Sequence, residues 1–530
     1  MKAKGGDVTV SRIMNAKGRT VPTRLFGWEK AFEPYQGPFT IVEKKPIRKR
    51  ASAPMRGYLP GRNKVAESLK KAIEASGLSD GMTISFHHHL RNGDAVLPMV
   101  LDVIASMGIK NLTLAPSSLT DAHQCVVDHI RSGVISRITT SGLRGKLGEA
   151  ISYGELPCPV IIRSHGGRAR AIEEGSINID VAFIAAPSAD REGNVTGAMG
   201  PEGCGSLGYA MVDARYARHV IAITDNLVPY PLVPKISIPQ NQVDQVVVVD
   251  KIGDSTKIAT GAARITKNPV DLRIAKNAFD LICASGLLEE GFSFQVGVGG
   301  ASLAVASFLR EYMIEKNIKG GFGLGGIGGY MVELLREGLF EALFDVQSFD
   351  ASVTESILNN PLHIEIDQSQ YANPFVDCMV NLLDVVALAA LDVDVDFNVN
   401  VLTGNDGIIR GASGGHCDTA AGAKLAVVLA PSFRGGIPTI KDRVQTIVTP
   451  GETVDAIVTE RGICINPRRE DLLERALKAN LPVKDIGKLK EEVERLTGKP
   501  KTPEFDEEKI VAVVEYRDGT LIDSVYARKR

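Results

Sequence analysis

A strand–loop–helix pattern occurs twice in this chain, and this duplication is the feature that most constrains the fold. GMTISF at residues 81–86 is echoed by GFSFQV at 291–296, and in each copy a loop, a helix and another strand follow. IDVAFIAAPSADREGNVTGA at 179–198 is likewise echoed by VDVDFNVNVLTGNDGIIRGA at 393–412. Because both ends of the unit recur at nearly the same spacing, the sequence predicts two related halves.

Short β-rich runs alternate with helical or glycine-rich stretches in the first of these halves. The runs are MTISF, KNLTLAP, VISRITTS, PVIIRS, IDVAFIAAP and HVIAITD. Strands that alternate with helices predict a mostly parallel sheet covered on both faces. The predicted fold class is therefore α/β, with two duplicated, open, mostly parallel-sheet domains. Duplicated halves commonly bind a ligand in the cleft between them.

Three segments follow from this pattern: an N-terminal extension over 1–61, a first α/β domain over 62–265 and a second over 266–530. The extension is rich in Lys, Arg, Pro and Gly and contains KKPIRKR at 44–50. Because this basic run stands alone, it indicates a solvated leader or a contact with a partner more than nucleic-acid binding.

A helix and a hairpin are predicted near the two ends of the duplicated region. Apolar residues at helical spacing predict a helix from Asn63 to Ser76, closed by a glycine. Near the C-terminus, a helix over 485–496 precedes IVAVVEY-RDG-TLIDSVY, in which Asp518 and Gly519 supply the turn of a hairpin. We expect this hairpin to close a sheet edge in the second domain.

The composition excludes several classes of protein. A net charge of -2 offers no basic excess to neutralise nucleic-acid phosphates. The seven cysteines are scattered singly without metal-ligand spacing, which argues against a structural zinc site and indicates reduced thiols. Neither an apolar segment after Met1 nor a run of 18 apolar residues occurs, so we expect a cytoplasmic protein with no membrane contact.

FQVGVGGASLAVASFL at 294–309 is the first candidate ligand site. An apolar strand there runs into a glycine turn and then a helix, whose free N–H groups and dipole favour an anion. A tight turn without a ligand is an equally good interpretation, because the dinucleotide fingerprint is incomplete. The residues assigned to cofactor binding are Gly297, Gly299, Gly300 and Ser302.

GIIRGASGGHCDTAAGAK at 407–424 is the second candidate. Its glycines free backbone N–H groups to bind an oxyanion. His416 could shuttle a proton or be structural, and Cys417, which has no basic neighbour in sequence, is interpreted as a packing residue. The further residues assigned to cofactor binding are Gly411, Ser413, Gly414, Gly415 and Asp418.

Polar loops that follow the first-half strands form the third candidate. The carboxyl ends of parallel strands share one edge of a sheet, so these side chains should lie together. Several cations on one rim suit a polyanion such as a tricarboxylate, although scattered surface charges are the alternative. The adjacent histidines lack a carboxylate to complete a ligand set, so no metal is expected. The assigned residues are His87, His88, Arg91, Ser117, Ser118, Arg144, His165 and Arg168.

Taken together, these motifs resemble the α subunits of citrate lyase, within the CoA-transferase superfamily, from about residue 60 to the end. The matching stretches are GMTISFHHHLRNGD, KNLTLAPSSL, ITTSGLRG, RSHGGR, INIDVAFIAAPS, GSLGYA, GFSFQVGVGGASLAV, FDVQSFD, FNVNVLTGNDGIIRGASGGHCDTA and VVEYRDGTLIDSV. The resemblance implies two CoA-transferase-like domains. It also implies an activity, citrate CoA-transferase, in which citrate displaces acetate from a thioester on an acyl-carrier subunit.

The resemblance further implies partners and a co-substrate. The partners would be the β subunit, which cleaves the citryl thioester, and the γ subunit, which carries the acyl group, in an oligomer. The co-substrate would be a thioester of CoA or of phosphoribosyl-dephospho-CoA, with no cofactor bound covalently to this chain.

One departure from the wider superfamily bears on mechanism. Many relatives keep a Glu nucleophile on a strand of the second half. By register, that strand is GFGLGGIGG at 321–329, and the nucleophile position falls near Gly325 and Gly326, where no carboxylate is present. The resemblance then implies a ternary complex without a covalent enzyme intermediate. Our hypothesis is that glycine leaves room for a citrate carboxylate to attack the thioester directly.

Three rival functions stay open at this point. A CoA-transferase for citramalate or an acetyl-CoA hydrolase would use the same scaffold, because a pocket cannot be sized from sequence. A non-catalytic scaffold subunit belongs to another class, and glycine loops in both halves count against it.

Overall fold

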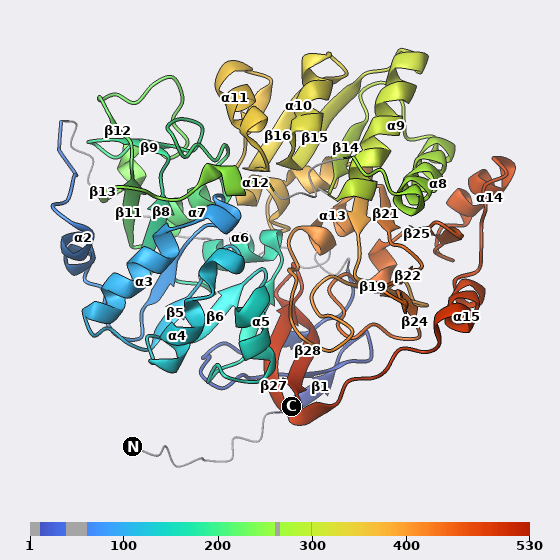
Figure 1. Cartoon of the computed structure of the whole chain (residues 1–530), viewed down its shortest axis with the longest axis horizontal. Coiled ribbons are helices and arrows are strands. Elements are labelled where there is room, and N and C mark those ends of the chain that lie inside the picture. The colour runs from blue at the N-terminus through green and yellow to red at the C-terminus, as the bar shows by residue number, and fades with distance from the viewer. Residues whose placement is uncertain (1–10, 39–60, 260–264, 298) are drawn as a thin grey trace.

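The computed structural model describes residues 11–38, 61–259, 265–297 and 299–530. The basic run at 44–50 and Val298 lie outside the described residues, so the interpretation of that run stays a prediction. Figure 1 shows the two halves side by side, the first in blue to green and the second in yellow-green to red.

The first half is built on seven parallel strands that belong to a ten-stranded sheet. Their order across the sheet is β13-β11-β8-β4-β5-β6-β7. Their bounds are β4 (Thr83–Ser85), β5 (Leu112–Leu114), β6 (Ile135–Thr140), β7 (Val160–Arg163), β8 (Val181–Ala185), β11 (His219–Thr224) and β13 (Gln245–Val248). Every β-rich run predicted for this half contains one of these strands.

The second half repeats this order in an eight-stranded sheet, as β25-β21-β18-β14-β15-β16-β17, with β26 antiparallel at the edge. The bounds are β14 (Ser293–Val296), β15 (Gly320–Ile327), β16 (Phe340–Ser348), β17 (His363–Glu365), β18 (Val385–Ala389), β21 (Leu425–Leu429), β25 (Ala456–Thr459) and β26 (Gly462–Ile465). The strand-by-strand match confirms the predicted duplication and the α/β fold class.

A small three-stranded sheet accompanies each large sheet, so the small sheet is duplicated as well. The first has the order β10-β9-β12 and the second the order β20-β19-β24. Their bounds are β9 (Ser188–Asp190), β10 (Val195–Thr196), β12 (Leu227–Val228), β19 (Asp392–Asp394), β20 (Val399–Asn400) and β24 (Ile440–Lys441). The sequence echo between 179–198 and 393–412 therefore reflects a shared structure.

Helices cover the sheets, and the first of them is shorter than predicted. Helix α2 begins only at Leu69, because Val65 forms a parallel bridge with Val246 and extends the sheet edge instead. The helix bounds are α2 (Leu69–Ser76), α3 (Val96–Ser106), α4 (Val126–Arg131), α5 (Gly145–Ser152), α6 (His165–Glu173), α7 (Gly208–Tyr216), α8 (Pro269–Ser285), α9 (Gly300–Lys316), α10 (Gly329–Arg336), α11 (Ala351–Asn359), α12 (Gln368–Ala372), α13 (His416–Gly422), α14 (Glu470–Lys478) and α15 (Ile486–Thr497).

The predicted C-terminal hairpin is present but lies in the sheet of the first half, not in the second domain. Strand β27 (Phe505–Glu515) pairs parallel with β7, and β28 (Thr520–Arg528) carries the short N-terminal strand β3 (Glu33–Pro34). Its Glu515 carboxylate is buried against the guanidinium groups of Arg163 and Arg170, with nitrogen–oxygen distances of 2.8 and 2.7 Å. This pairing explains why the hairpin joins β7. The domain boundary between 265 and 266 stays a prediction.

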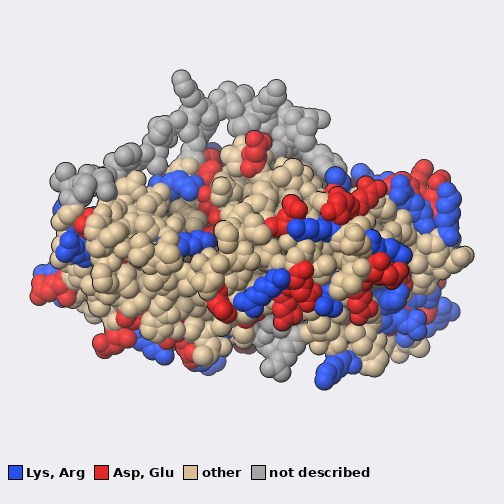
Figure 2. Space-filling view, turned by 90° about the horizontal axis from the view of Figure 1, so that it is seen from above, with Lys and Arg blue, Asp and Glu red and all other residues tan. Residues whose placement is uncertain are grey.

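Charged side chains are spread unevenly over the surface. In the view of Figure 2, Lys and Arg are interspersed with Asp and Glu over the right-hand side, whereas uncharged residues cover most of the left-hand side. Within the described ranges, no helix combines the length and the apolar character needed to cross a membrane.

Candidate active site

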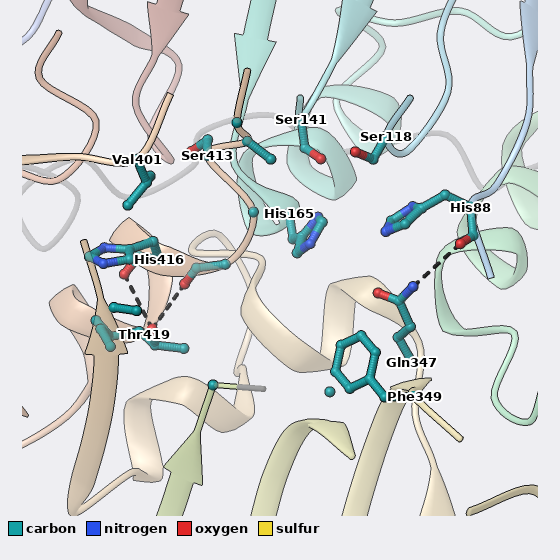
Figure 3. Close-up of a pocket in the computed structure, with 18 of the residues that line it drawn as sticks. His88, Ser118, Ser141, His165, Gln347, Phe349, Val401, Ser413, His416 and Thr419 are labelled. Atoms are coloured by element: carbon teal, nitrogen blue, oxygen red, sulfur yellow. Dashed lines mark hydrogen bonds between the residues drawn. The ribbon is translucent and has the colours of Figure 1, made fainter. Parts of the chain in front are cut away.

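A cavity of about 790 Å³ lies between the two halves and is lined by residues from both. The loops that line it from the first half follow the carboxyl ends of β4, β5, β6 and β7, as predicted. The assigned residues on its wall are His88, Arg91, Ser118, Arg144, His165, Gly297, Gly326, Gly411, Ser413, Gly414, Gly415 and His416. Figure 3 shows how the first-half histidines and serines face the glycine loop and His416.

The glycine loop over 407–415 is fastened to the first half by backbone hydrogen bonds. The carbonyl oxygen of Gly411 accepts from the N–H of Leu143 over 3.1 Å, and that of Gly414 accepts from the N–H of His165 over 2.7 Å. The N–H of Ser413 donates in turn to the carbonyl oxygen of Ser141. The loop is thereby held across the cavity with little freedom to move.

The first half makes the reciprocal contact through its own glycine-rich loop. The hydroxyl of Ser206 donates to the carbonyl oxygen of Asp345 over 2.9 Å, and the N–H of Ser206 donates to Ser348 Oγ over 3.0 Å. A Cβ at Gly208 would lie 2.7 Å from the carbonyl oxygen of Val346, so only glycine fits there. The GSLGYA motif therefore helps to hold the halves together.

Three imidazoles and a tyrosine ring form a stack on one wall of the cavity. The Tyr209 ring centroid lies 4.9 Å from that of His88, 5.1 Å from His89 and 4.6 Å from His165. Burial lowers the pKa of His88 well below its ordinary value and that of His165 to about 3. These histidines are consequently neutral at pH 7 and act as hydrogen-bonding groups, not as cations.

Arg91 and Arg144 supply fixed positive charge on the first-half wall of the cavity. Within the described residues, neither has a carboxylate at salt-bridge distance, whereas Arg91 stacks on the Phe349 ring at 4.9 Å. Burial, and then the like charge of Arg144, lower the pKa of Arg91 to about 10. Two guanidinium groups that repel one another across a cavity favour an anion between them.

Two assigned residues do not face the cavity, which corrects the prediction for both. Arg168 is buried and donates to both carboxylate oxygens of Asp213 at 2.8 Å, so its charge is already neutralised. Asp418 is also buried, and it accepts hydrogen bonds from Ser164 and from the backbone of Gly166. Neither residue is among those that line the cavity, and the contacts of both are with the surrounding structure.

Other assigned residues lie behind the cavity wall. The Ser117 hydroxyl is 2.6 Å from His88 Nδ1, and His87 Nδ1 is 2.7 Å from His89 Nδ1, so both support the histidine stack. Gly325 lies at a bulge of β15 with a φ of 101°, and a Cβ there would lie 2.8 Å from Cδ of Gln295. The room that we expected beside Gly325 is therefore occupied by the Gln295 side chain.

The predicted anion site at the start of α9 is only partly on the cavity wall. Gly297 lines the cavity, and Gly299 and Gly300 begin the helix behind it. The Ser302 hydroxyl is buried and, in the described part of the chain, has no hydrogen-bond partner. This assignment stays a prediction.

His416 and Cys417 begin helix α13. His416 Nδ1 lies 2.7 Å from the Thr449 hydroxyl, and burial lowers the pKa of His416 to about 4, so the imidazole is neutral. Burial raises the pKa of the Cys417 thiol to about 12, which agrees with a packing role.

Among the residues described, no cluster of three or more His, Cys, Asp or Glu is placed to hold a metal ion.

Sequence reasoning missed several polar and aromatic residues of the wall. Most of them lie within the motifs of the family resemblance, but nothing in those motifs shows which side chains reach the cavity. Two, Tyr371 and Arg434, lie outside those motifs and are brought to the wall by the fold. The missed residues include Ser141, Tyr209, Gln295, Gln347, Phe349, Tyr371, Arg410 and Arg434.

Comparison with known proteins places this arrangement among homologous chains. The family model described as citrate lyase, alpha subunit (CitF), matches residues 62–528. The citrate lyase alpha chain of Escherichia coli (strain K12) is 53% identical over 467 residues, which are 88% of this chain and 91% of the relative. That of Haemophilus influenzae is also 53% identical, over 88% of this chain and 93% of the relative.

Solved structures give the same picture. A crystal structure of the alpha subunit of citrate lyase in complex with citrate, from Streptococcus mutans, superposes with a TM-score of 0.89 at 53% identity, covering 92% of this chain and 96% of that one. A malonate decarboxylase alpha subunit from Acinetobacter baumannii, at 18% identity and a TM-score of 0.60 over 82% of this chain and 88% of its own, shares the fold.

Proposed function

The chain belongs to the citrate lyase alpha subunit family, and from this premise we propose that it is a citrate CoA-transferase. It would exchange acetate for citrate on the thioester of an acyl-carrier subunit, giving a citryl-carrier and free acetate. The thioester of CoA or of phosphoribosyl-dephospho-CoA is the co-substrate. The β and γ subunits of citrate lyase are the proposed partners.

The observation that carries this proposal is the pair of arginines on the first-half wall, for which the described residues offer no carboxylate partner. Arg91 and Arg144 lie on the cavity wall beside neutral histidines, and Ser118 adds a hydroxyl donor. A citrate ion brings three carboxylates, which two guanidinium groups and several neutral donors can bind without leaving a buried charge unpaired. Acetate, with one carboxylate and no other polar group, would be held less tightly and would leave after exchange.

The second-half wall suits the other substrate. Leu388, Ala389, Ala390 and Leu391 line the cavity there, together with Val401. An apolar strip of this kind favours the aliphatic part of a thioester arm. We place the thioester end of the arm beside the glycine loop and the citrate on the arginine side, so that the reacting groups meet in the middle.

We propose that the two substrates react directly. A citrate carboxylate oxygen attacks the acetyl thioester carbonyl, the carbonyl electron pair moves to oxygen, and collapse expels the thiolate and leaves an acetyl–citryl anhydride. The thiolate then attacks the citryl carbonyl, and acetate leaves. No proton is gained or lost overall, and no bond to the protein forms.

An exchange assay with the purified chain tests the function. Acetyl-CoA is mixed with citrate, citramalate or water, and acetate and acyl-CoA products are followed by chromatography. Citryl-CoA that forms only with citrate is the expected result. Acyl-CoA product with citramalate alone would indicate a citramalate CoA-transferase, and acetate release in water alone would indicate an acetyl-CoA hydrolase. No product at all would favour a scaffold subunit. Borohydride after acyl-CoA treatment should leave every Glu unreduced, because no enzyme thioester forms.

A further inference from the structure

Two side chains from different elements of the second half meet at the cavity wall. Gln295 lies on β14 and Tyr371 on α12, and Gln295 Nε2 donates to the Tyr371 hydroxyl oxygen over 2.9 Å. Both residues line the cavity, and the Tyr371 side chain is otherwise buried. Neither belongs to the cation-rich first-half wall or to the glycine loop.

In this arrangement the Gln295 amide presents its nitrogen to the Tyr371 hydroxyl, while its oxygen has no hydrogen-bond partner among the described residues. Because the hydroxyl oxygen accepts from the Gln295 amide, the O–H of Tyr371 points away from that residue. In the described part of the chain, no acceptor is within hydrogen-bond distance of this O–H. Burial raises the pKa of Tyr371, so the group keeps its proton and stays a donor.

The Tyr371 hydroxyl is next to the glycine loop. A Cβ at Gly415 would lie 2.6 Å from the Tyr371 hydroxyl oxygen, so glycine is required there for the hydroxyl to come close. Within the described residues, the N–H groups of Gly414 and Gly415 also donate to no acceptor. One side-chain donor and two backbone donors are therefore gathered at the same part of the wall.

We infer that Tyr371 is a catalytic residue that donates a hydrogen bond to the oxyanion formed when a carboxylate attacks the thioester carbonyl, and that Gln295 is its positioning residue. The inference rests on the proposed exchange reaction. As the carbon–oxygen bond to citrate forms, the carbonyl electron pair moves onto oxygen, and this negative charge is stabilised by the Tyr371 O–H. When the electron pair on oxygen forms the carbonyl again, the carbon–sulfur bond breaks and the thiolate leaves. The Tyr371 proton stays on the tyrosine throughout.

Two variants test this assignment in the exchange assay. Removal of one such donor typically costs about 10²–10³ in kcat. Tyr371→Phe should therefore lower kcat by about that factor, with the KM values for citrate and acetyl-CoA changed less than about threefold. Gln295→Glu should lower kcat similarly, although Tyr371 is intact, because a carboxylate only accepts and turns the tyrosine proton toward itself. The double variant should be no slower than Tyr371→Phe.

Tyr35→Phe is the matched control. It removes a buried tyrosine hydroxyl that lies outside the cavity and has no hydrogen-bond partner among the described residues. It should keep the wild-type kcat. An inactive wild-type chain would count against the proposed exchange itself. An active wild type with unchanged kcat in Tyr371→Phe, or with only KM raised, would overturn the inference. If Tyr371→Phe does not fold, Gln295→Glu decides, and wild-type kcat in that variant overturns it.

Discussion

The carboxylate of Asp418, at the start of α13 in the second half, accepts a hydrogen bond from Ser164 Oγ of the first half over 2.8 Å. The same carboxylate accepts from the N–H of Gly166 over 2.9 Å and lies 3.5 Å from Arg517 Nε, in the turn of the C-terminal hairpin. One buried side chain thus connects three distant segments of the chain.

Asp418→Asn should destabilise the whole chain. The substitution leaves the buried Arg517 without its carboxylate, and breaking a buried pair in this way costs about 3–5 kcal/mol. Urea denaturation followed by circular dichroism measures the change. Asp406→Asn, which removes an exposed carboxylate paired with Arg410, is the control and should change the free energy of unfolding by less than about 1 kcal/mol. Equal effects in the two variants would refute a role for the junction.

Arg144→Leu should weaken citrate binding selectively. A charge-assisted hydrogen bond to a carboxylate contributes about 1.5–3 kcal/mol, so the citrate KM should rise by about 10–100-fold. The KM for acetyl-CoA should change little, because the arm is placed on the opposite wall. Arg131→Leu removes an exposed arginine that is paired with Glu155 outside the cavity, and its kinetics should match wild type. Unchanged citrate kinetics in Arg144→Leu would rule out the assignment.

Gly325→Ala should lower kcat through Gln295. A Cβ at this position would lie 2.8 Å from two atoms of the Gln295 amide and must displace it from Tyr371. The matched control is Gly338→Ala, which also has a positive φ, of 73°, but would meet no atom within 4 Å. Both variants carry backbone strain of about 1 kcal/mol. Only Gly325→Ala should lose exchange activity, and equal activities would contradict the proposed contact.

Stability should fall as the pH falls from about 6.5 toward 4. Burial lowers the pKa of His416 from 6.5 to about 4, so between these values the unfolded chain binds a proton that the folded chain does not. For one group, this proton binding lowers the free energy of unfolding by about 3 kcal/mol once the pH has fallen to about 4. Above about pH 6.5 the free energy of unfolding does not depend on this group. His416→Asn, which keeps a polar atom near Thr449, should lose less stability between pH 7 and pH 4.5 in urea denaturation. Parallel losses in the variant and the wild type would refute this origin of the acid sensitivity.

The strands, the duplication and the position of the site could be predicted because they depend on local patterns. Apolar runs and turns fix β4 to β8, and the rule for the carboxyl ends of parallel strands brings His88, Ser118 and Arg144 together. The same local patterns could not distinguish Arg144, which faces the cavity, from Arg168, whose partner Asp213 follows much later in the chain. That distinction depends on tertiary contacts.

The donors on the second-half wall escaped prediction for a related reason. Tyr371 lies on a short helix with no motif, and its meaning comes from Gln295 and Gly415, which approach it from separate elements. The placement of the hairpin was wrong because its sheet is chosen by the ion pairs of Glu515 with Arg163 and Arg170. A buried carboxylate in an apolar strand gives no indication in sequence of where its partners are.

The position of β27 and β28 also sets an order of events during synthesis. The sheet of the first half receives its ninth strand from residues 520–528, which are synthesised after every strand of the second half's sheet. Until then Arg163 lacks the Glu515 carboxylate with which it pairs, and β7 lacks its neighbour β27. We therefore expect the first half to complete its sheet only after the second half has been synthesised.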